Sequence, residues 1–299
     1  MNKRFKSNNL HNNVTSSWLQ KSLYQDIQKK WWKRFLLRIF ISRIFSKIIS
    51  FYLKSIFSRF HVKKIIVKNH IDTSLFHPSS FKSYNDFFVR TYKKINFDNS
   101  VSAFISPGEG QMCIFNINAN SIFNIKNTPY HLRDLLKNDY LAEKYLNGFL
   151  VMLRLQVFDY HRYIFVDEGV QSKNNVKIQG RLHTVNPIAF KYFNVFSENS
   201  REYTILKTLN FGEIIQIEIG ALLVGKINNH SIISFKKGQE KGFFSFGGSV
   251  IVLVIEPNKI KFNQLILNNS LIGIETKVNI GETIGFKLKQ SINRKDDWN

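Results

Sequence analysis

The chain has 299 residues, and 43% of them are hydrophobic, which is enough to bury one large core or two modest ones. Its single cysteine, Cys113, excludes an intrachain disulfide framework and a cysteine-based metal site, and we expect no bound metal. The net charge of +22 predicts an anionic partner, and both nucleic acid and anionic lipid meet that requirement. The distribution of the charge has to separate these two classes.

Residues 1–16 are polar and rich in Asn and Ser, a composition that predicts disorder. Residues 17–75 are expected to form a basic, amphipathic helical region. Fifteen Lys and Arg stand against one acid, Asp26, within residues 1–65. The stretch WWKRFLLRIFISRIFSKIISFYLKSIFSRF interleaves basic and bulky apolar residues, with apolar runs too short to span a membrane.

One helical stripe of this stretch carries Trp32, Phe35, Leu36, Ile39 and Phe40, a pattern typical of helices that lie in a membrane interface. Two alternatives stay open. The helix could pack on the protein's own core, or it could bind nucleic acid, which the many large aliphatic residues disfavour. We expect a peripheral membrane protein that binds no nucleic acid. Since no signal peptide is recognisable, the cytoplasmic face of the cell membrane is its expected location.

The remainder, residues 76–299, is predicted to be one β-rich domain. YNDFFVR at 84–90 reads as a short helix, and one further helix is predicted at about 131–145. From residue 101 onward the hydrophobic period approaches two, which predicts strands. The expected fold is α+β, with a helical amino-terminal membrane-associating region followed by a single, mostly antiparallel, β-rich domain. The predicted strands are VSAFI, QMCIFNI, GFLVMLRLQ, NVKIQGRLHTV, EYTILKTL, GEIIQIEIGALLVG and SVIVLVIE.

Several short motifs hold residues that are able to carry chemistry. Each is ordinary alone, because most such residues are turn formers, solvated surface groups or satisfied core histidines. The candidates are Glu109 in SPGEG, Asp159, His161 and Arg162 in DYHRY, Asn186 in VNPIAF, and His183 and His230 beyond them.

Gly247-Gly248-Ser249 leads directly into the apolar run Val250 to Ile255. Glycine permits unusual backbone conformations, so the Ser249 hydroxyl could attack the carbonyl of Gly248. An N-to-O acyl shift followed by elimination would break the chain between 248 and 249 and convert Ser249 into a pyruvoyl group. Such a carbonyl captures an amine and serves as an electron sink. The ordinary alternative is a turn before a core strand.

These motifs occur in one order that resembles the phosphatidylserine decarboxylase family, in its bacterial branch with a GGS cleavage site. YNDFFVR, SPGEG, DYHRY, VNPIA, FGEIIQIEIGALLVG, KKGQEKGFFSFGGS and IGIETKVNIGETIG are each similar to a family block. The resemblance covers about 84–286. It implies a pyruvoyl cofactor derived from Ser249, a phosphatidylserine substrate, and phosphatidylethanolamine and CO2 as products.

The resemblance also implies site residues. The family's aspartate in SPxDG and its second histidine in DYHRxH act with the serine in self-cleavage, and the first histidine, matched by His161, acts in decarboxylation. Here Glu109 replaces that aspartate, Ile164 replaces the second histidine and Val250 replaces a threonine. The expected catalytic residues are Ser249, His161, Glu109 and Asp159, and the expected substrate-binding residues are Asn186 and Arg162.

Because isoleucine cannot accept a proton, two rival hypotheses stay open. One is a processing-defective, catalytically silent homologue that only binds lipid. The other is a decarboxylase for another amine-bearing acid. The expected partners are phosphatidylserine, an anionic membrane surface and, after cleavage, the two chains for each other; a homodimer is left open.

Overall fold

The computed structural model describes residues 22, 24, 27, 29–120, 122–125, 128–172, 175–186, 189, 192–221, 226–245 and 249–288. The expected disordered start, 1–16, lies outside these residues, as do Gly248 and residues 222–225 of the GALLVG segment.

Helices come first in the chain and strands dominate after them. The helices are α2 (Trp31–Phe40), α3 (Arg43–Lys54), α4 (Arg59–Lys68), α5 (Tyr84–Phe88), α6 (Leu132–Leu136), α7 (Asp139–Lys144), α8 (Val195–Glu198) and α9 (Gln264–Leu271), with 3-10 turns η1 (Ile56–Ser58) and η2 (Thr73–Leu75). The strands are β1 (Phe76–His77), β2 (Thr91–Tyr92), β3 (Ala103–Ile105), β4 (Gly110–Asn116), β5 (Ile122–Ile125), β6 (Thr128–His131), β7 (Phe149–Leu155), β8 (Arg162–Ile164), β9 (Gly169–Gln171), β10 (Val176–Ile178), β11 (Arg201–Thr208), β12 (Gly212–Gly220), β13 (Lys226–Asn229), β14 (Ser234–Phe235), β15 (Glu240–Ser245), β16 (Ser249–Ile255), β17 (Ile260–Phe262), β18 (Thr276–Val278) and β19 (Thr283–Lys287).

The main sheet has nine strands in the order β14-β9-β11-β12-β16-β7-β4-β18, with β10 paired to β11. Two three-stranded sheets, β13-β15-β8 and β17-β19-β3, and two small pairs, β1-β2 and β5-β6, complete the strands. All of these strand pairs are antiparallel. The predicted α+β class, with amino-terminal helices before an antiparallel β-rich domain, is confirmed.

Strand β16 lies in the middle of the main sheet, hydrogen-bonded to β12 on one side and to β7 on the other. All seven of its residues, Ser249–Ile255, are buried. An apolar run of Val, Ile and Leu suits a strand covered on both faces, and this explains why SVIVLVI forms the central strand.

Two local predictions are wrong. The single helix expected at 131–145 is interrupted, since Lys137 adopts a left-handed conformation with φ 52° and ends α6. Asn138 then caps α7 by accepting a hydrogen bond from the Leu141 amide. The strand expected at 175–185 covers only Val176–Ile178, because the Asn199 side chain bonds both backbone groups of His183 in place of a ladder.

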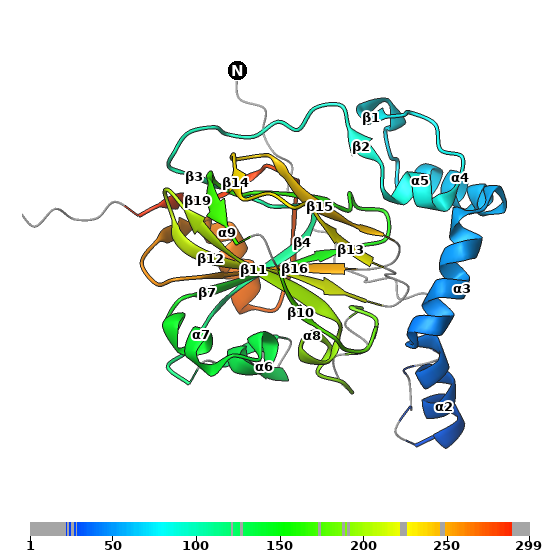
Figure 1. Cartoon of the computed structure of the whole chain (residues 1–299), viewed down its shortest axis with the longest axis horizontal. Coiled ribbons are helices and arrows are strands. Elements are labelled where there is room, and N and C mark those ends of the chain that lie inside the picture. The colour runs from blue at the N-terminus through cyan, green and yellow to red at the C-terminus, as the bar shows by residue number, and fades with distance from the viewer. Residues whose placement is uncertain are drawn as a thin grey trace, which may run out of the picture.

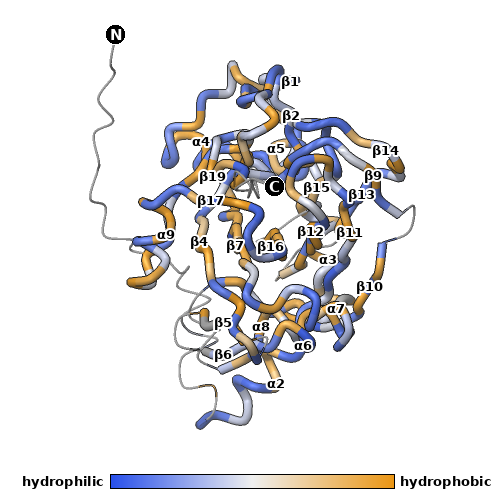
Figure 2. The backbone as a smooth tube through the Cα atoms, turned by 90° about the vertical axis from the view of Figure 1, so that its left-hand side faces the viewer, coloured by the Kyte–Doolittle hydropathy of each residue, from blue (hydrophilic) through white to orange (hydrophobic). Residues whose placement is uncertain are grey.

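Helices α2, α3 and α4 form a column at one side of the molecule, beside the β-rich part (Figure 1). Seen after a 90° turn, α2 lies at the end opposite to β1 and β2 (Figure 2). Among the residues that the structure describes, no helix has the length and apolar character needed to cross a bilayer.

The predicted apolar stripe of α2 divides between two environments. Trp32, Phe35 and Ile39 are 46%, 59% and 42% exposed, whereas Lys33 and Leu37 form the buried face. The other two stripe residues, Leu36 and Phe40, are partly buried and pack against the protein's own core, so only part of the stripe remains on the surface.

Candidate active site

Ser249 begins strand β16 and lies opposite Gly220 of β12 and Leu155 of β7. Its side chain is buried, and its Oγ makes no hydrogen bond to any residue that the structure describes. Leaving a buried hydroxyl unpaired costs about 1–3 kcal/mol, so such a group calls for a functional explanation. Ser249 stays the predicted nucleophile, and it lies at the first residue of the central strand, as the sequence predicts.

A buried ion pair lies on the same face of the sheet as Ser249. Ser249 is opposite Gly220 and Ile251 is opposite Glu218, so the side chains of Ser249 and Glu218 project to one side. Lys241 Nζ of β15 lies 2.9 Å from Glu218 Oε1 and 2.8 Å from Asn229 Oδ1. Both ionised side chains are at most 1% exposed.

None of the sequence motifs identifies this pair. A signal was present, because Gln216 and Glu218 are polar residues at alternate positions of an otherwise apolar strand, GEIIQIEIG. Gln216 donates to Glu218, and Asn229 donates to the same carboxylate. Burial raises the pKa of Glu218, and the attraction of Lys241 opposes that rise without cancelling it.

His161 is fully buried, and its ring lies 3.7 Å from the ring of Phe88 of α5. Its Nδ1 is 2.9 Å from the backbone oxygen of Asp159. A carbonyl oxygen only accepts, so Nδ1 carries the proton and Nε2 is the basic atom of the neutral ring. The short helix YNDFF thus holds one wall of this histidine site.

Glu109 and Asp159 meet at a third residue, Lys277 of β18. Lys277 Nζ lies 3.1 Å from Glu109 Oε1 and 2.6 Å from Asp159 Oδ1, and the Tyr92 hydroxyl donates to Glu109 Oε2. The sequence predicts both carboxylates but misses the lysine. The IGIETKVNIGETIG block contains Lys277, and only its position across the fold gives it a role.

Charge and burial act in opposite directions in this cluster. Burial raises the pKa of Asp159, and the attraction of Lys277 only partly offsets it. Burial lowers the pKa of Lys277, but the combined charges of Asp159 and Glu109 outweigh it, so the net shift is upward. Lys277 therefore stays cationic and holds both carboxyl groups.

Ile164 occupies the position of the second histidine and is fully buried. Its amide donates to the Pro107 carbonyl at 2.8 Å, which joins the end of β8 to the SPGEG turn. The backbone of residue 164 therefore lies next to the turn that carries Glu109. In this chain it supplies no titratable group.

The two residues predicted to bind substrate have other contacts as well. Arg162 donates to the carbonyls of Val89 and Arg90 and to Glu240 at 2.8 Å, which ties α5 to β15. Asn186 is half-buried, and its backbone amide donates to Thr184 Oγ1. Their role toward substrate stays a prediction.

The other two histidines occupy different environments. His230 lies at the surface, with Nε2 2.8 Å from Glu240 Oε1, and His183 is buried against the ring of Phe193. Across the described residues, no group of three or more His, Cys, Asp or Glu is arranged to hold a metal ion.

Comparison with known proteins gives a consistent result. A family model described as phosphatidylserine decarboxylase matches residues 84–286. Phosphatidylserine decarboxylase proenzyme 2 of Clostridium acetobutylicum is 47% identical over 255 residues, which covers 84% of this chain and 87% of that protein. Phosphatidylserine decarboxylase proenzyme of Clostridium botulinum (strain Hall) is 43% identical over 266 residues, covering 84% and 88%.

Proposed function

The chain belongs to the phosphatidylserine decarboxylase family, and from this premise we propose that it cleaves itself before Ser249 and then decarboxylates phosphatidylserine. The carboxylate of the serine head group leaves as CO2 and a proton takes its place, which yields phosphatidylethanolamine. The observation that carries the proposal is the buried, unbonded hydroxyl of Ser249 at the entry of the central strand.

Ser249 fits the pyruvoyl group that the family implies, because its hydroxyl is buried and makes no hydrogen bond that cleavage would have to break. This group supplies an electron sink for the decarboxylation. After cleavage, β16 would keep its ladders to β12 and β7, so the chain that begins at 249 would stay attached to the rest.

His161 is the proposed base for Ser249 and the proposed proton carrier in decarboxylation. Lys277 engages both Glu109 and Asp159, so these carboxylates are already ion-paired. The Nδ1 contact with the Asp159 carbonyl fixes the ring tautomer and leaves Nε2 as the atom that exchanges a proton. Asn186 and Arg162 remain proposed substrate-binding residues.

The amino-terminal helices are proposed to hold the protein on an anionic membrane, at the cytoplasmic face. Their outward residues are large and apolar, as in Phe51 at 83% and Ile44 at 74% exposed, and basic residues alternate with them. Helices of this composition lie in the interface between head groups and acyl chains. The protein would then lie on the membrane that contains its lipid substrate.

The test of self-processing is the intact mass of the purified chain after a denaturing separation. The wild type should give two fragments split before Ser249, the smaller with a pyruvoyl terminus, and Ser249→Ala should stay at 35.1 kDa. His161→Ala should slow the cleavage by at least about 100-fold. A wild-type chain that remains whole for days with membranes present would contradict the proposal.

Ile164→His is the matched gain-of-function variant. A histidine there adds a base beside the SPGEG turn, so cleavage should accelerate.

The substrate is tested by comparing the release of CO2 from phosphatidylserine with its release from soluble amino acids. Faster release from a soluble amino acid would overturn the lipid assignment.

A further inference from the structure

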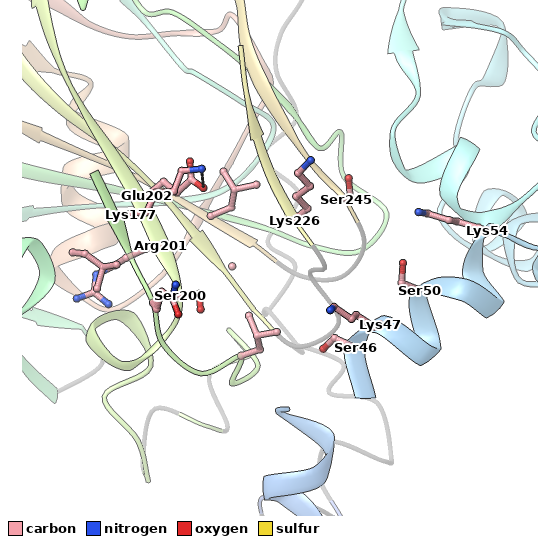
Figure 3. Close-up of a pocket in the computed structure, with 15 residues that line it drawn as sticks. Ser46, Lys47, Ser50, Lys54, Lys177, Ser200, Arg201, Glu202, Lys226 and Ser245 are labelled. Atoms are coloured by element: carbon pink, nitrogen blue, oxygen red, sulfur yellow. Dashed lines mark ion pairs between the residues drawn. The ribbon is translucent and has the colours of Figure 1, made fainter. Parts of the chain in front are cut away.

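A cavity of about 550 Å³ lies between helix α3 and the edges of strands β10, β11, β13 and β15. Figure 3 shows Lys47 and Lys54 reaching from α3 toward the side where Lys226 and Ser245 lie. This volume is in the range of small-molecule sites. The cavity therefore has room for a polar lipid head group.

The described lining of the cavity is strongly cationic. It carries the lysines Lys47, Lys54, Lys177 and Lys226 but only one carboxylate, Glu202, which Lys177 and two asparagines already contact. The guanidinium of Arg201 donates to four backbone carbonyls, which leaves at most one of its five N–H groups for the cavity. The chemistry that fits this lining is an anion.

The cavity adjoins the reacting serine. Gly220, which lines it, is the ladder partner of Ser249, and Ser245, at the end of β15, also lines it. The cavity therefore reaches the strand neighbour of Ser249.

Helix α3 has one side that lines the cavity and another, apolar side that is exposed. Ser46, Lys47 and Ser50 face the cavity, while Ile44, Ile48 and Phe51 are 74%, 63% and 83% exposed on the outer surface. An interfacial helix with its apolar face in the bilayer would thus place its basic face beside the active site. Acyl chains would stay in the membrane while the head group reaches inward.

We propose that this cavity binds the anionic head group of a phospholipid, with the phosphate held between Lys47 of α3 and Lys226 of β13. The proposal deepens the proposed function and rests on it, since it names the side chains that receive the substrate. It also assigns to α3 a direct contact with the head group, in addition to anchoring.

Binding is tested on the full chain carrying Ser249→Ala, so that no cleavage intervenes. Calorimetry measures the dissociation constant for monomeric dihexanoyl phosphatidylserine. Lys47→Gln with Lys226→Gln should raise it about tenfold, the size expected for losing charge-assisted hydrogen bonds. The control, Lys261→Gln with Lys287→Gln, removes the same charge from exposed positions on β17 and β19 and should leave it unchanged.

The source of the anion is tested in parallel with glycerophosphoserine and inorganic phosphate. Weaker binding of phosphate than of the lipid, with the same lysine dependence, supports a head-group site. Equal affinity for phosphate and for the lipid would overturn the proposal. An equal loss of lipid affinity in the variant with Lys261→Gln and Lys287→Gln would also overturn it. In a cleaving background, the cavity variant should raise KM about tenfold and leave kcat unchanged.

The two proposals fail separately. If the wild type never cleaves but the Ser249→Ala chain binds the lipid through these lysines, the proposed function fails and the site stands. If the wild type cleaves and decarboxylates while the lysine variants bind and turn over normally, the proposed function stands and the site is wrong.

Discussion

At the scale of single residues, His183 shows how burial, helped by a neighbouring positive charge, sets a pH dependence. The ring is fully buried and lies 4.2 Å from the ring of Phe193. Desolvation, with a smaller contribution from Arg181, lowers its pKa from 6.5 to about 4. In the unfolded chain His183 binds a proton below pH 6.5, and in the folded protein it does not until about pH 4.

Because the unfolded state holds the extra proton in this window, stability is complete above pH 6.5 and falls as the pH drops toward 4. We predict that this residue lowers the free energy of unfolding by up to about 3 kcal/mol as the pH falls from 6.5 to 4, at 1.36 kcal/mol per pKa unit. Urea unfolding of the Ser249→Ala chain at pH 5 and pH 7 measures it. His183→Leu should reduce the difference in unfolding free energy between pH 5 and pH 7, whereas His230→Leu, at an exposed position, should retain it. The same difference in both variants would exclude His183 as its source.

The residues that sequence reasoning could name are those that sit in local motifs. Ser249 and His161 follow from GGS and DYHRY, and the structure places both in buried positions that suit chemistry. Lys277 could not be found in this way. It is more than a hundred residues from both carboxylates that it binds, so only the fold reveals its role.

At the scale of elements, hydrophobic period predicted the long strands well. β7, β11 and β16 begin and end within one residue of their predicted bounds, and β12 begins at its predicted first residue, because apolar side chains recur at strand spacing in all four. The helix at 131–145 failed at Lys137, where a left-handed residue breaks an otherwise helical pattern. A lysine carries no signal for that conformation, which glycine or asparagine would have given.

The Glu218–Lys241 pair joins two layers, since β12 belongs to the main sheet and β15 to a three-stranded sheet. Lys241→Met should destabilise the Ser249→Ala chain by about 3–5 kcal/mol, because it leaves Glu218 buried without its counter-charge. Urea unfolding at pH 7 measures the loss.

A double variant separates the ion pair from simple packing. Lys241→Met combined with Glu218→Leu should regain most of the lost stability, since it removes both buried charges. Lys261→Met, at an exposed position on β17, serves as the matched control and should change stability by less than about 0.5 kcal/mol. A double variant no better than the single one would show that the pair is not the source of the loss.

At the scale of the whole molecule, the positive charge and the exposed apolar surface coincide in one column of helices. Ten of the 43 Lys and Arg, and no acidic residue, fall within residues 31–68, and α2 and α3 expose Trp31, Ile44 and Phe51 by more than 70%. Exposed apolar clusters of this kind mark an interaction surface. Basic residues among them favour an anionic bilayer over a protein groove.

Apolar insertion and charge attraction can be separated by mutation and salt. Ile44→Asp with Phe51→Asp should weaken sedimentation with phosphatidylserine-containing vesicles at least tenfold, because burying each large apolar side chain contributes about 1.5–3 kcal/mol. Leu271→Asp with Ile272→Asp, at the end of α9 and 80% and 71% exposed, is the matched control and should bind as the wild type does. Raising the salt concentration should weaken wild-type binding only in part, since screening removes the charge attraction but leaves the apolar contact. If salt alone released the wild type completely, these helices would bind the membrane only by charge. If the control lost as much binding as the α3 variant, the loss would come from the added negative charge and not from the apolar residues of α3.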